Sequence, residues 1–156
     1  MSAVLSLGSN VGDRLGHLRA GLEVLQPYAV SSVWETDPVG GVAQDDFLNL
    51  VALVDADATD AWVRARRAER RAGRVRDVRW GPRTLDVDVV VALPPVPPEL
   101  TLPHPRAAER AFVLAPWLEL APDAVLPGAG PAADLLAALG AQGVRRTDLD
   151  TGWGRP

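Results

Sequence analysis

The spacing of apolar and polar positions along the chain predicts alternating strands and helices. Short apolar runs rich in Val, Leu and Ala predict strands over residues 3–7, 29–36, 47–55 and 85–92. Between the first two strands, leucines recur at helical spacing and form one apolar stripe: Leu15, Leu18, Leu22 and Leu25. A second helix between the third and fourth strands has an inner stripe of Trp62, Ala65, Ala68 and Ala72.

Residues that favour helix ends support these boundaries. Asn10 or Asp13 is a candidate N-cap of the first helix, and Asp57 or Thr59 of the second. Gly73 follows the second helix, where a C-terminal glycine is favoured. The order strand–helix–strand–strand–helix–strand predicts an α+β fold, a ferredoxin-like βαββαβ core whose antiparallel sheet is covered by helices.

The C-terminal part of the chain is expected to add further elements to this core. Residues 93–105 contain six prolines and are not expected to form regular structure. A short helix is predicted over residues 107–115, ended by Pro116, and a last helix over residues 131–140. At 156 residues we expect one domain spanning residues 1–156.

Composition excludes several kinds of chemistry. The chain has no cysteine, and all 16 basic residues are arginine, which removes thiolate chemistry, lysine Schiff bases and the lysine-bearing P-loop. A net charge of −4 argues against general binding to nucleic acid or membranes. The N-terminus lacks a basic signal-peptide region, and no apolar run approaches the ~20 residues of a membrane helix. We expect a cytoplasmic, monomeric protein with small-molecule substrates, no nucleic acid and no membrane.

Two acids in the fourth strand are the first candidates for chemistry. Asp86 and Asp88 lie two residues apart, so both carboxylates project from one face while Leu85 and Val87 point the other way. Such a pair suits a hard cation, and Mg²⁺ typically combines one or two carboxylates with water and substrate phosphates. The alternative is a solvent-exposed face of an edge strand.

Arginines concentrate just before these acids. Residues 64–83 hold nine of the 16, and those on the helix are expected to face solvent. Arg74, Arg76, Arg79 and Arg83 follow the helix and surround Trp80, which either stacks on a base or packs under the loop. Guanidinium groups bind phosphate oxygens in a forked geometry. Together with a metal site they predict a polyphosphate clamp, with ATP as the default donor.

Two further positions stand out. His104 lies between Pro103 and Pro105, so it is presented rigidly, either toward a ligand or simply at the surface. Asn49 lies within an apolar strand, where a buried amide needs hydrogen-bond partners that the protein or a ligand with amide-like edges could provide.

These motifs resemble those of the hydroxymethyl-dihydropterin pyrophosphokinases of folate biosynthesis. The resemblance extends over residues 3–127 in family order and spacing. It rests on Leu5-Ser6-Leu7-Gly8-Ser9-Asn10, Phe47-Leu48-Asn49, Gly73-Arg74-Val75-Arg76, the run from Arg79 to Asp88, Leu102-Pro103-His104-Pro105-Arg106 and Arg110-Ala111-Phe112. It implies transfer of the β,γ-pyrophosphoryl unit of ATP to the hydroxymethyl group of a dihydropterin, with release of AMP.

The resemblance also implies residue roles. Asp86 and Asp88 would hold two Mg²⁺ ions. Arg74 and Arg83 would contact the phosphates, with Arg83 and Arg110 neutralising charge during transfer. The implied ATP-binding residues are Glu69, Arg76, Trp80, Val89 and His104. Phe47 and Phe112 would sandwich the pterin, and Thr36, Asn49 and the backbone around Val39 would read its hydrogen-bonding edge.

Two other classes of function remain as alternatives. Ferredoxin-like sheets with arginine and aromatic residues can bind single-stranded nucleic acid, although the net charge and the acids on the strand disfavour this. An ATP-binding regulatory domain without turnover would bind the nucleotide but release no AMP.

Overall fold

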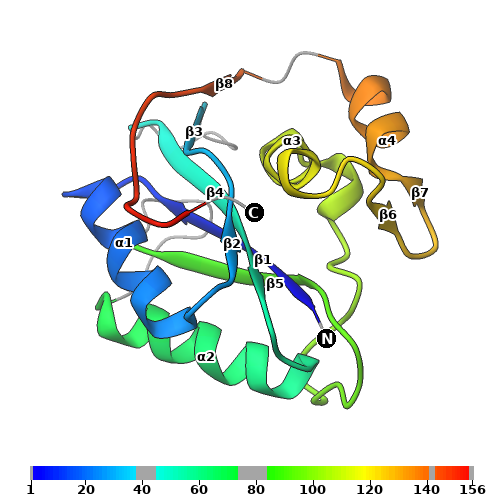
Figure 1. Ribbon diagram of the computed structural model, residues 1–156, viewed down its shortest axis with the longest axis horizontal. Helices are drawn as coiled ribbons and strands as arrows, with labels where there is room; N and C mark the ends of the chain where they lie inside the picture. The colour runs from blue at the N-terminus through cyan, green and yellow to red at the C-terminus, as the bar shows by residue number, and fades with distance from the viewer. Residues whose placement is uncertain (1, 38–44, 74–83, 141–142, 155–156) are drawn as a thin grey trace.

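The protein is described by a computed structural model over residues 2–37, 45–73, 84–140 and 143–154 (Figure 1). An antiparallel sheet runs through its centre in the order β5-β1-β4-β3-β8, and β2 also pairs with β4. These strands are β1 (Ala3–Ser9), β2 (Ala29–Val30), β3 (Trp34–Thr36), β4 (Phe47–Val54), β5 (Asp86–Val91) and β8 (Val144–Arg146). The order confirms the predicted ferredoxin-like core.

Two helices cover one face of this sheet (Figure 1). α1 (Arg14–Leu25) begins at Asp13, whose carboxylate accepts a hydrogen bond from the Gly16 N–H at 3.0 Å. α2 (Ala58–Arg71) begins at Asp57, which accepts from the Asp60 N–H at 2.8 Å. Of the two candidates for each cap, the aspartates are therefore the ones used. Gly73 follows α2 with a φ of +67°, a conformation that glycine adopts without strain.

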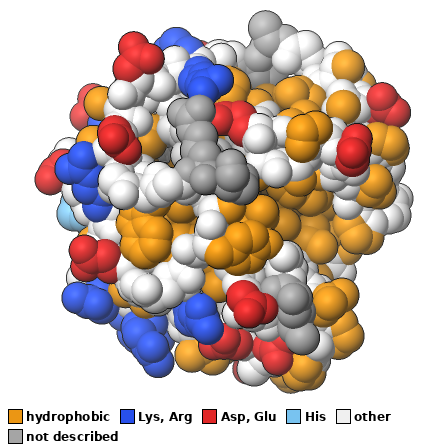
Figure 2. Space-filling view, in the orientation of Figure 1, with side chains coloured by type: hydrophobic (Ala, Val, Ile, Leu, Met, Phe, Trp, Pro, Cys, Tyr) orange, Lys and Arg blue, Asp and Glu red, His pale blue; other side chains and the backbone are white. Residues whose placement is uncertain are grey.

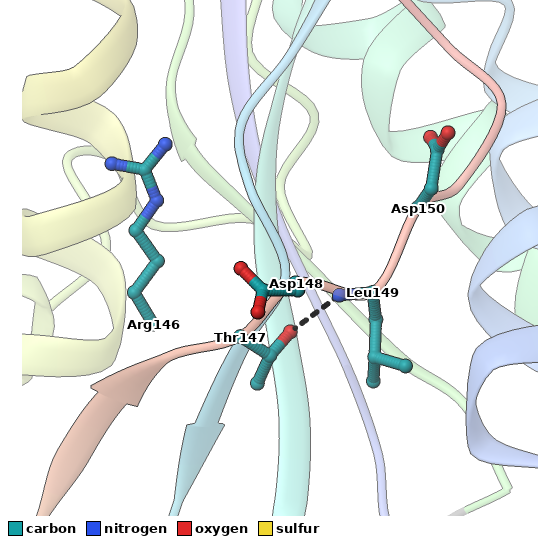
Figure 3. A pocket seen from close by; sticks show the side chains of 5 residues that line it. All are labelled: Arg146, Thr147, Asp148, Leu149 and Asp150. Atoms are coloured by element: carbon teal, nitrogen blue, oxygen red, sulfur yellow. Dashed lines mark hydrogen bonds between the residues drawn. The ribbon is translucent and has the colours of Figure 1, made fainter.

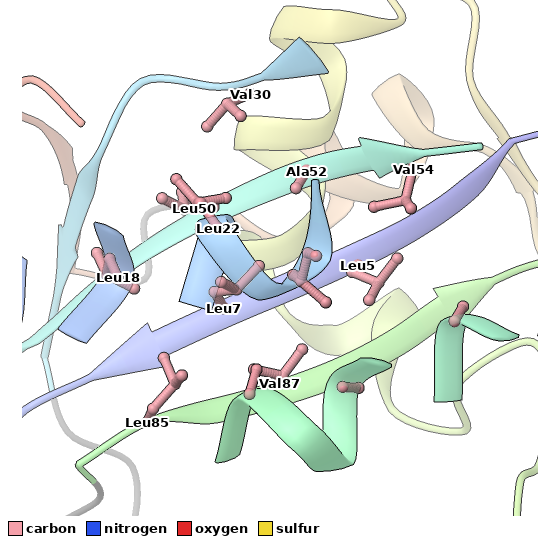
Figure 4. Packing of buried hydrophobic residues seen from close by; sticks show 14 of the residues in the cluster. Leu5, Leu7, Leu18, Leu22, Val30, Leu50, Ala52, Val54, Leu85 and Val87 are labelled. Atoms are coloured by element: carbon pink, nitrogen blue, oxygen red, sulfur yellow. The ribbon is translucent and has the colours of Figure 1, made fainter. Parts of the chain in front are cut away.

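The main core lies between α1, α2 and the sheet. Alternate residues of β1, β4 and β5 point toward the helices, and Leu18 and Leu22 of α1 pack among them (Figure 4). The fully buried strand residues of this layer include Leu5, Leu7, Leu50 and Val87. This packing requires the residues between them to face the other side of the sheet.

The opposite face of the sheet carries a second apolar cluster. α3 (Ala111–Leu120) and α4 (Ala132–Leu139) pack on it, with the small hairpin of β6 (Val125–Leu126) and β7 (Gly130–Pro131) beside them. Their apolar residues meet Val4, Val51 and Val90, which alternate with the main-core positions. Figure 2 shows hydrophobic side chains gathered over the half of the molecule that these elements occupy. No helix in the described residues is long and apolar enough to cross a membrane.

Two predicted elements differ from the structure. The helix predicted over residues 107–115 is wrong: residues 107–109 form a single 3-10 turn, and α3 runs from Ala111 through Pro116 to Leu120. Burial of Val113, Leu114 and Trp117 against the sheet keeps the helix continuous despite the hydrogen bond that proline cannot donate.

The strand predicted over residues 29–36 is interrupted. It forms β2 and β3, because the Ser31 hydroxyl accepts the hydrogen bond of the Val51 N–H at 3.0 Å. A serine side chain here takes the place of a backbone acceptor, which breaks the regular ladder.

The central core predicts a clear stability contrast. We expect Leu50→Ala to lower the free energy of unfolding by about 2–5 kcal/mol, because a fully buried side chain is replaced by a cavity. Val63→Ala, on the exposed side of α2, should change it by no more than about 0.5 kcal/mol. Urea unfolding of both variants measures this, and equal losses would contradict the assigned core.

Candidate active site

A band of polar and small residues crosses the face of the sheet opposite α1 and α2. The strand register places Gly8 of β1 between Asn49 of β4 and Asp86 of β5, and Ser6 beside Asp88. Trp34 of β3 is the partner of Asn49, and Thr36 that of Phe47. We call Ser6, Gly8, Thr36, Asn49, Asp86 and Asp88 the polar band. It occupies the positions that alternate with the core, so α1 and α2 lie on the other side of the sheet.

Basic groups face the acidic end of the band. Arg110, at the start of α3, places Nη1 3.6 Å from Oδ2 of Asp88. His104 Nε2 lies 4.0 Å from the same oxygen. The Nδ1 atom of His104 accepts a hydrogen bond from the Arg106 N–H at 3.2 Å, so in a neutral ring the proton is on Nε2, toward Asp88. The backbone of His104 is fixed as well, because its N–H donates to Val90 O at 2.8 Å.

Burial makes the charged form of Asp88 costly. Desolvation, followed by repulsion from Asp86, raises the pKa of Asp88 to about 7, and Arg110 opposes this only in part. Burial and the nearby Arg110 lower the pKa of His104. A divalent cation between the two carboxylates would offset both causes of the Asp88 shift.

The two acids fit a magnesium site completed by a substrate. The described residues contain no group of three or more His, Cys, Asp or Glu side chains arranged around one point. A pair of carboxylates alone suits Mg²⁺, which keeps several waters and takes phosphate oxygens as further ligands.

The other end of the band combines an amide with aromatic rings. Asn49 is buried, and its Nδ2 donates to Thr36 Oγ1 at 2.6 Å. Gly8 lies directly beneath: a Cβ added there would lie 2.8 Å from Asn49 Oδ1 and 3.4 Å from Phe47 Cδ1. A further ring, that of Phe112 in α3, lies beside the acidic end, with the Arg110 guanidinium 5.4 Å from its centre.

Glu69 occupies a different position, at the outer edge of β5. Its carboxylate is buried, and Oε2 accepts a hydrogen bond from the Val87 N–H at 3.0 Å. Arg66 Nη2 donates to Val87 O at 2.8 Å and lies 3.0 Å from Glu69 Oε1. The pair therefore satisfies both backbone groups of Val87 that face away from β1. Val89 lies two residues further along the same edge.

A second polar feature lies at the far edge of the sheet. A surface pocket there is lined by Arg146, Thr147, Asp148, Leu149 and Asp150 (Figure 3). Its chain is held to the sheet by the Thr147 N–H, which donates to Val33 O at 2.9 Å. None of the residues that line this pocket belongs to the polar band.

The sequence comparison identifies the family. A family model described as 7,8-dihydro-6-hydroxymethylpterin-pyrophosphokinase (HPPK) matches residues 4–122. The chain belongs to this family. Its activity is therefore the transfer of pyrophosphate from ATP to the hydroxymethyl group of a dihydropterin, a reaction of folate biosynthesis. The family membership confirms the resemblance found in the sequence.

Individual relatives agree with this. A Mycobacterium tuberculosis 2-amino-4-hydroxy-6-hydroxymethyldihydropteridine pyrophosphokinase is 46% identical over 155 residues, covering 87% of this chain and 82% of its own. A Pseudomonas aeruginosa protein of the same name is 37% identical over 152 residues, covering 91% and 94%. In a solved Plasmodium falciparum HPPK-DHPS triple mutant, a similar fold is found with a TM-score of 0.62 at 14% identity, covering 88% of this chain and 44% of that one.

Of the site residues expected from the sequence for this pyrophosphokinase, ten lie within the described residues, and eight of these lie on or beside the polar band, whereas Glu69 and Val89 do not. Asp86, Asp88, His104 and Arg110 lie at the acidic end, and Thr36, Phe47 and Asn49 at the β3–β4 end. Phe112 lies beside Arg110, and Glu69 and Val89 lie along β5. Five expected residues fall outside the described residues: Val39, Arg74, Arg76, Trp80 and Arg83.

Sequence reasoning gave Gly8 no role of its own. The motif around it was recognised, but its close approach to Asn49 depends on the pairing of two strands about forty residues apart, which no local pattern reveals. The contacts of Arg145 with acids of β3 and β4 were missed for the same reason.

The raised pKa of Asp88 predicts a pH-dependent stability. A folded-state pKa of about 7 lies above the ordinary 3.8, so the protonated form stabilises the fold at low pH and this contribution is lost as the pH rises toward 7. In metal-free protein at about pH 8, we expect Asp88→Asn to raise the free energy of unfolding by roughly 1–2 kcal/mol, after allowance for partial solvent screening.

The measurement is urea unfolding in the presence of a chelator between about pH 5 and pH 8. The increase in the free energy of unfolding caused by Asp88→Asn should become smaller as the pH falls. Asp148→Asn, a change at an exposed carboxylate, serves as the control and should have little effect. A pH-independent gain, or a loss of stability at about pH 8, would contradict the assigned cost of the buried carboxylate.

Proposed function

We propose that this pyrophosphokinase uses two Mg²⁺ ions held by Asp86 and Asp88. The observation that supports this is the pair of carboxylates on one face of β5, one of them with a pKa raised by burial and by the other's charge. When bound, the ions would stabilise the attacking and leaving oxygens of the displacement. The asparagine, threonine and aromatic residues beside the pair suit a flat heterocycle with a hydrogen-bonding edge.

The basic residues are proposed to balance charge during transfer. The pterin hydroxyl attacks the β-phosphorus of ATP in line, the bond to the α-phosphate oxygen breaks, and AMP leaves. Arg110 is placed to offset negative charge near Asp88, from which it is 3.6 Å away. His104, with its Nε2 proton toward the same region, would donate to a phosphate oxygen. No protein nucleophile is required.

The pterin is proposed to bind at the β3–β4 end of the band. Thr36 and Asn49 are buried and hydrogen-bonded to each other, so their orientations are fixed before the substrate arrives. Phe47 and Phe112 are half-buried and would stack on its two faces. The backbone around Val39 is proposed to complete the edge contacts.

The nucleotide is proposed to lie along β5 with its phosphates toward the acids. Glu69 and the backbone near Val89 would contact the nucleoside, and His104 the phosphates. Arg74 and Arg83 would hold the phosphates, with Arg83 sharing charge neutralisation with Arg110, while Arg76 and Trp80 would close over them. The enzyme is proposed to be monomeric, and its use of ATP supports a cytoplasmic location.

Product analysis tests the proposal directly. With ATP, Mg²⁺ and hydroxymethyl-dihydropterin, AMP should accumulate in proportion to the pterin consumed, because transfer is at the β-phosphorus. Removing Mg²⁺ with a chelator should abolish release, and re-adding it should restore release. ADP as the main product would refute pyrophosphate transfer, and AMP release unaffected by chelation would refute the metal role.

Asp86→Asn serves as the matched variant in that assay. We expect it to lower kcat by at least about a hundredfold, because the loss of metal charge costs several kcal/mol in the transition state. Arg67→Ala, a change of charge on the helix α2, should leave kcat within about twofold. Protein without turnover that still binds ATP would favour the regulatory alternative, and metal-independent binding of oligonucleotides would favour the nucleic-acid module.

Gly8→Ala tests the pterin end separately. Its Cβ would lie 2.8 Å from Asn49 Oδ1, so the buried amide must shift from its place beside Thr36. We expect the KM for the pterin to rise about tenfold while the KM for ATP changes little. Gly154→Ala, where no atom lies within 4 Å of the added Cβ, is the control. Equal increases in both KM values would show that Gly8 does not act on the pterin side.

A further inference from the structure

One arginine beyond the family-matched residues joins both ends of the β3–β4 connection. Arg145 of β8 places Nη2 2.6 Å from Asp46 Oδ2 and 3.3 Å from Glu35 Oε1. Its Nη1 lies 3.1 Å from Asp37 Oδ1. A single guanidinium thus bridges three carboxylates from two different strand ends, and the family model ends at residue 122.

These carboxylates adjoin the proposed pterin residues. Asp37 directly follows Thr36, and Asp46 directly precedes Phe47, while Thr36 and Phe47 are themselves the last backbone partners of the β3–β4 ladder. Fixing the distance between Asp37 and Asp46 therefore fixes the end of the ladder on which Thr36 and Phe47 lie.

The backbone of β8 is well placed to hold Arg145 there. Arg145 pairs with Glu35 in the ladder, and the Asp37 N–H donates to Gly143 O at 3.2 Å. Gly143 has a φ of +64°, and a Cβ at this position would collide with the Asp37 carboxylate, so the close approach requires glycine. In Figure 1, β8 lies beside β3 at the edge of the sheet.

A second arginine, from α1, contacts two of the residues that Arg145 joins. Arg14 of α1 places Nη1 3.2 Å from Glu35 Oε2 and donates to Asp46 O at 3.0 Å. Glu35 is thus held between two guanidinium groups. Without Arg145, the carboxylates of Glu35, Asp37 and Asp46 would be left close together with less positive charge between them.

The small free energy of these ion pairs limits their effect to local geometry. Arg145 is about half exposed, at 45%, and exposed ion pairs contribute little to stability. The network is therefore too weak to carry the global fold. Its effect is confined to the geometry of the strand ends, where small displacements of a binding residue have large consequences.

We propose that Arg145 is a positioning residue for the pterin substrate. It holds Asp37 and Asp46 together and so keeps Thr36 and Phe47 in their binding arrangement. The inference rests on the proposed pterin role of Thr36 and Phe47. The proposal assigns a substrate-specific task to β8. No residue of β8 belongs to the polar band.

Steady-state kinetics of Arg145→Ala, with Arg146→Ala as control, test the proposal. Arg146 is the next residue of the same strand and carries the same charge, but its ion-pair partner is Glu119, whose Oε2 lies 3.9 Å from Arg146 Nη2. We expect Arg145→Ala to raise the KM for the pterin about tenfold, with kcat and the KM for ATP within about twofold. Arg145→Lys should be intermediate, because an ammonium cannot bridge carboxylates as a planar fork does.

Amide exchange supplies a readout that does not depend on turnover. The amides of Phe47 and Asn49 should exchange faster in Arg145→Ala and be unchanged in Arg146→Ala, with both variants melting within a few degrees of the wild type. Wild-type protein that releases no AMP would refute the proposed function, while the exchange comparison would still decide whether Arg145 fixes the strand end. Equal rises in both KM values, or unchanged pterin KM and exchange, would overturn the positioning role.

Discussion

The alternation of side chains along β1, β4 and β5 is the constraint on which the site depends. Leu5, Leu7 and Leu50 must face α1 and α2 to form the core, so Ser6, Gly8 and Asn49 necessarily face the other way. A shift of one residue in any strand would exchange core and site positions together. The core packing therefore orients the functional side chains without any separate device, and α3 packs on Val4, Val51 and Val90 of the same face.

Placing the carboxylates of Asp86 and Asp88 close together costs electrostatic free energy, and the rest of the fold offsets this cost only in part. Burial of Asp88 next to Asp86 raises its pKa, and Arg110 is too far away, at 3.6 Å, to make a short ion pair. Arg110 also lies over the ring of Phe112, and this contact helps to hold the guanidinium beside the acids. A tighter pair with Asp88 would stabilise the resting protein, but it would also compete with a cation for the same oxygen.

Sequence could predict the features that repeat locally. The strand period placed Asp86 and Asp88 on one face, and cap chemistry located the starts of α1 and α2 near Asp13 and Asp57. It failed where distant packing overrides a local signal: Pro116 does not end α3, and the Ser31 side chain interrupts the second strand. Residues 144–146 carry two arginines and one valine, a pattern too short to indicate a strand, and β8 exists because β3 offers it a free edge.

The two edges of the sheet are completed in different ways, and this difference bears on where a nucleotide can bind. At β3 the edge is covered by a further strand, β8, which carries the exposed charges of Arg145 and Arg146 and so disfavours pairing with another chain. At β5 the outward backbone groups of Val87 are satisfied by the side chains of Arg66 and Glu69. Side chains can exchange hydrogen bonds with a ligand by rotation, whereas a paired strand must be peeled away. A nucleoside that takes hydrogen bonds along β5 would therefore meet a smaller barrier than one at β3. The same strand, β5, carries Asp86 and Asp88, the acids proposed to hold the metal ions that would bind its phosphates.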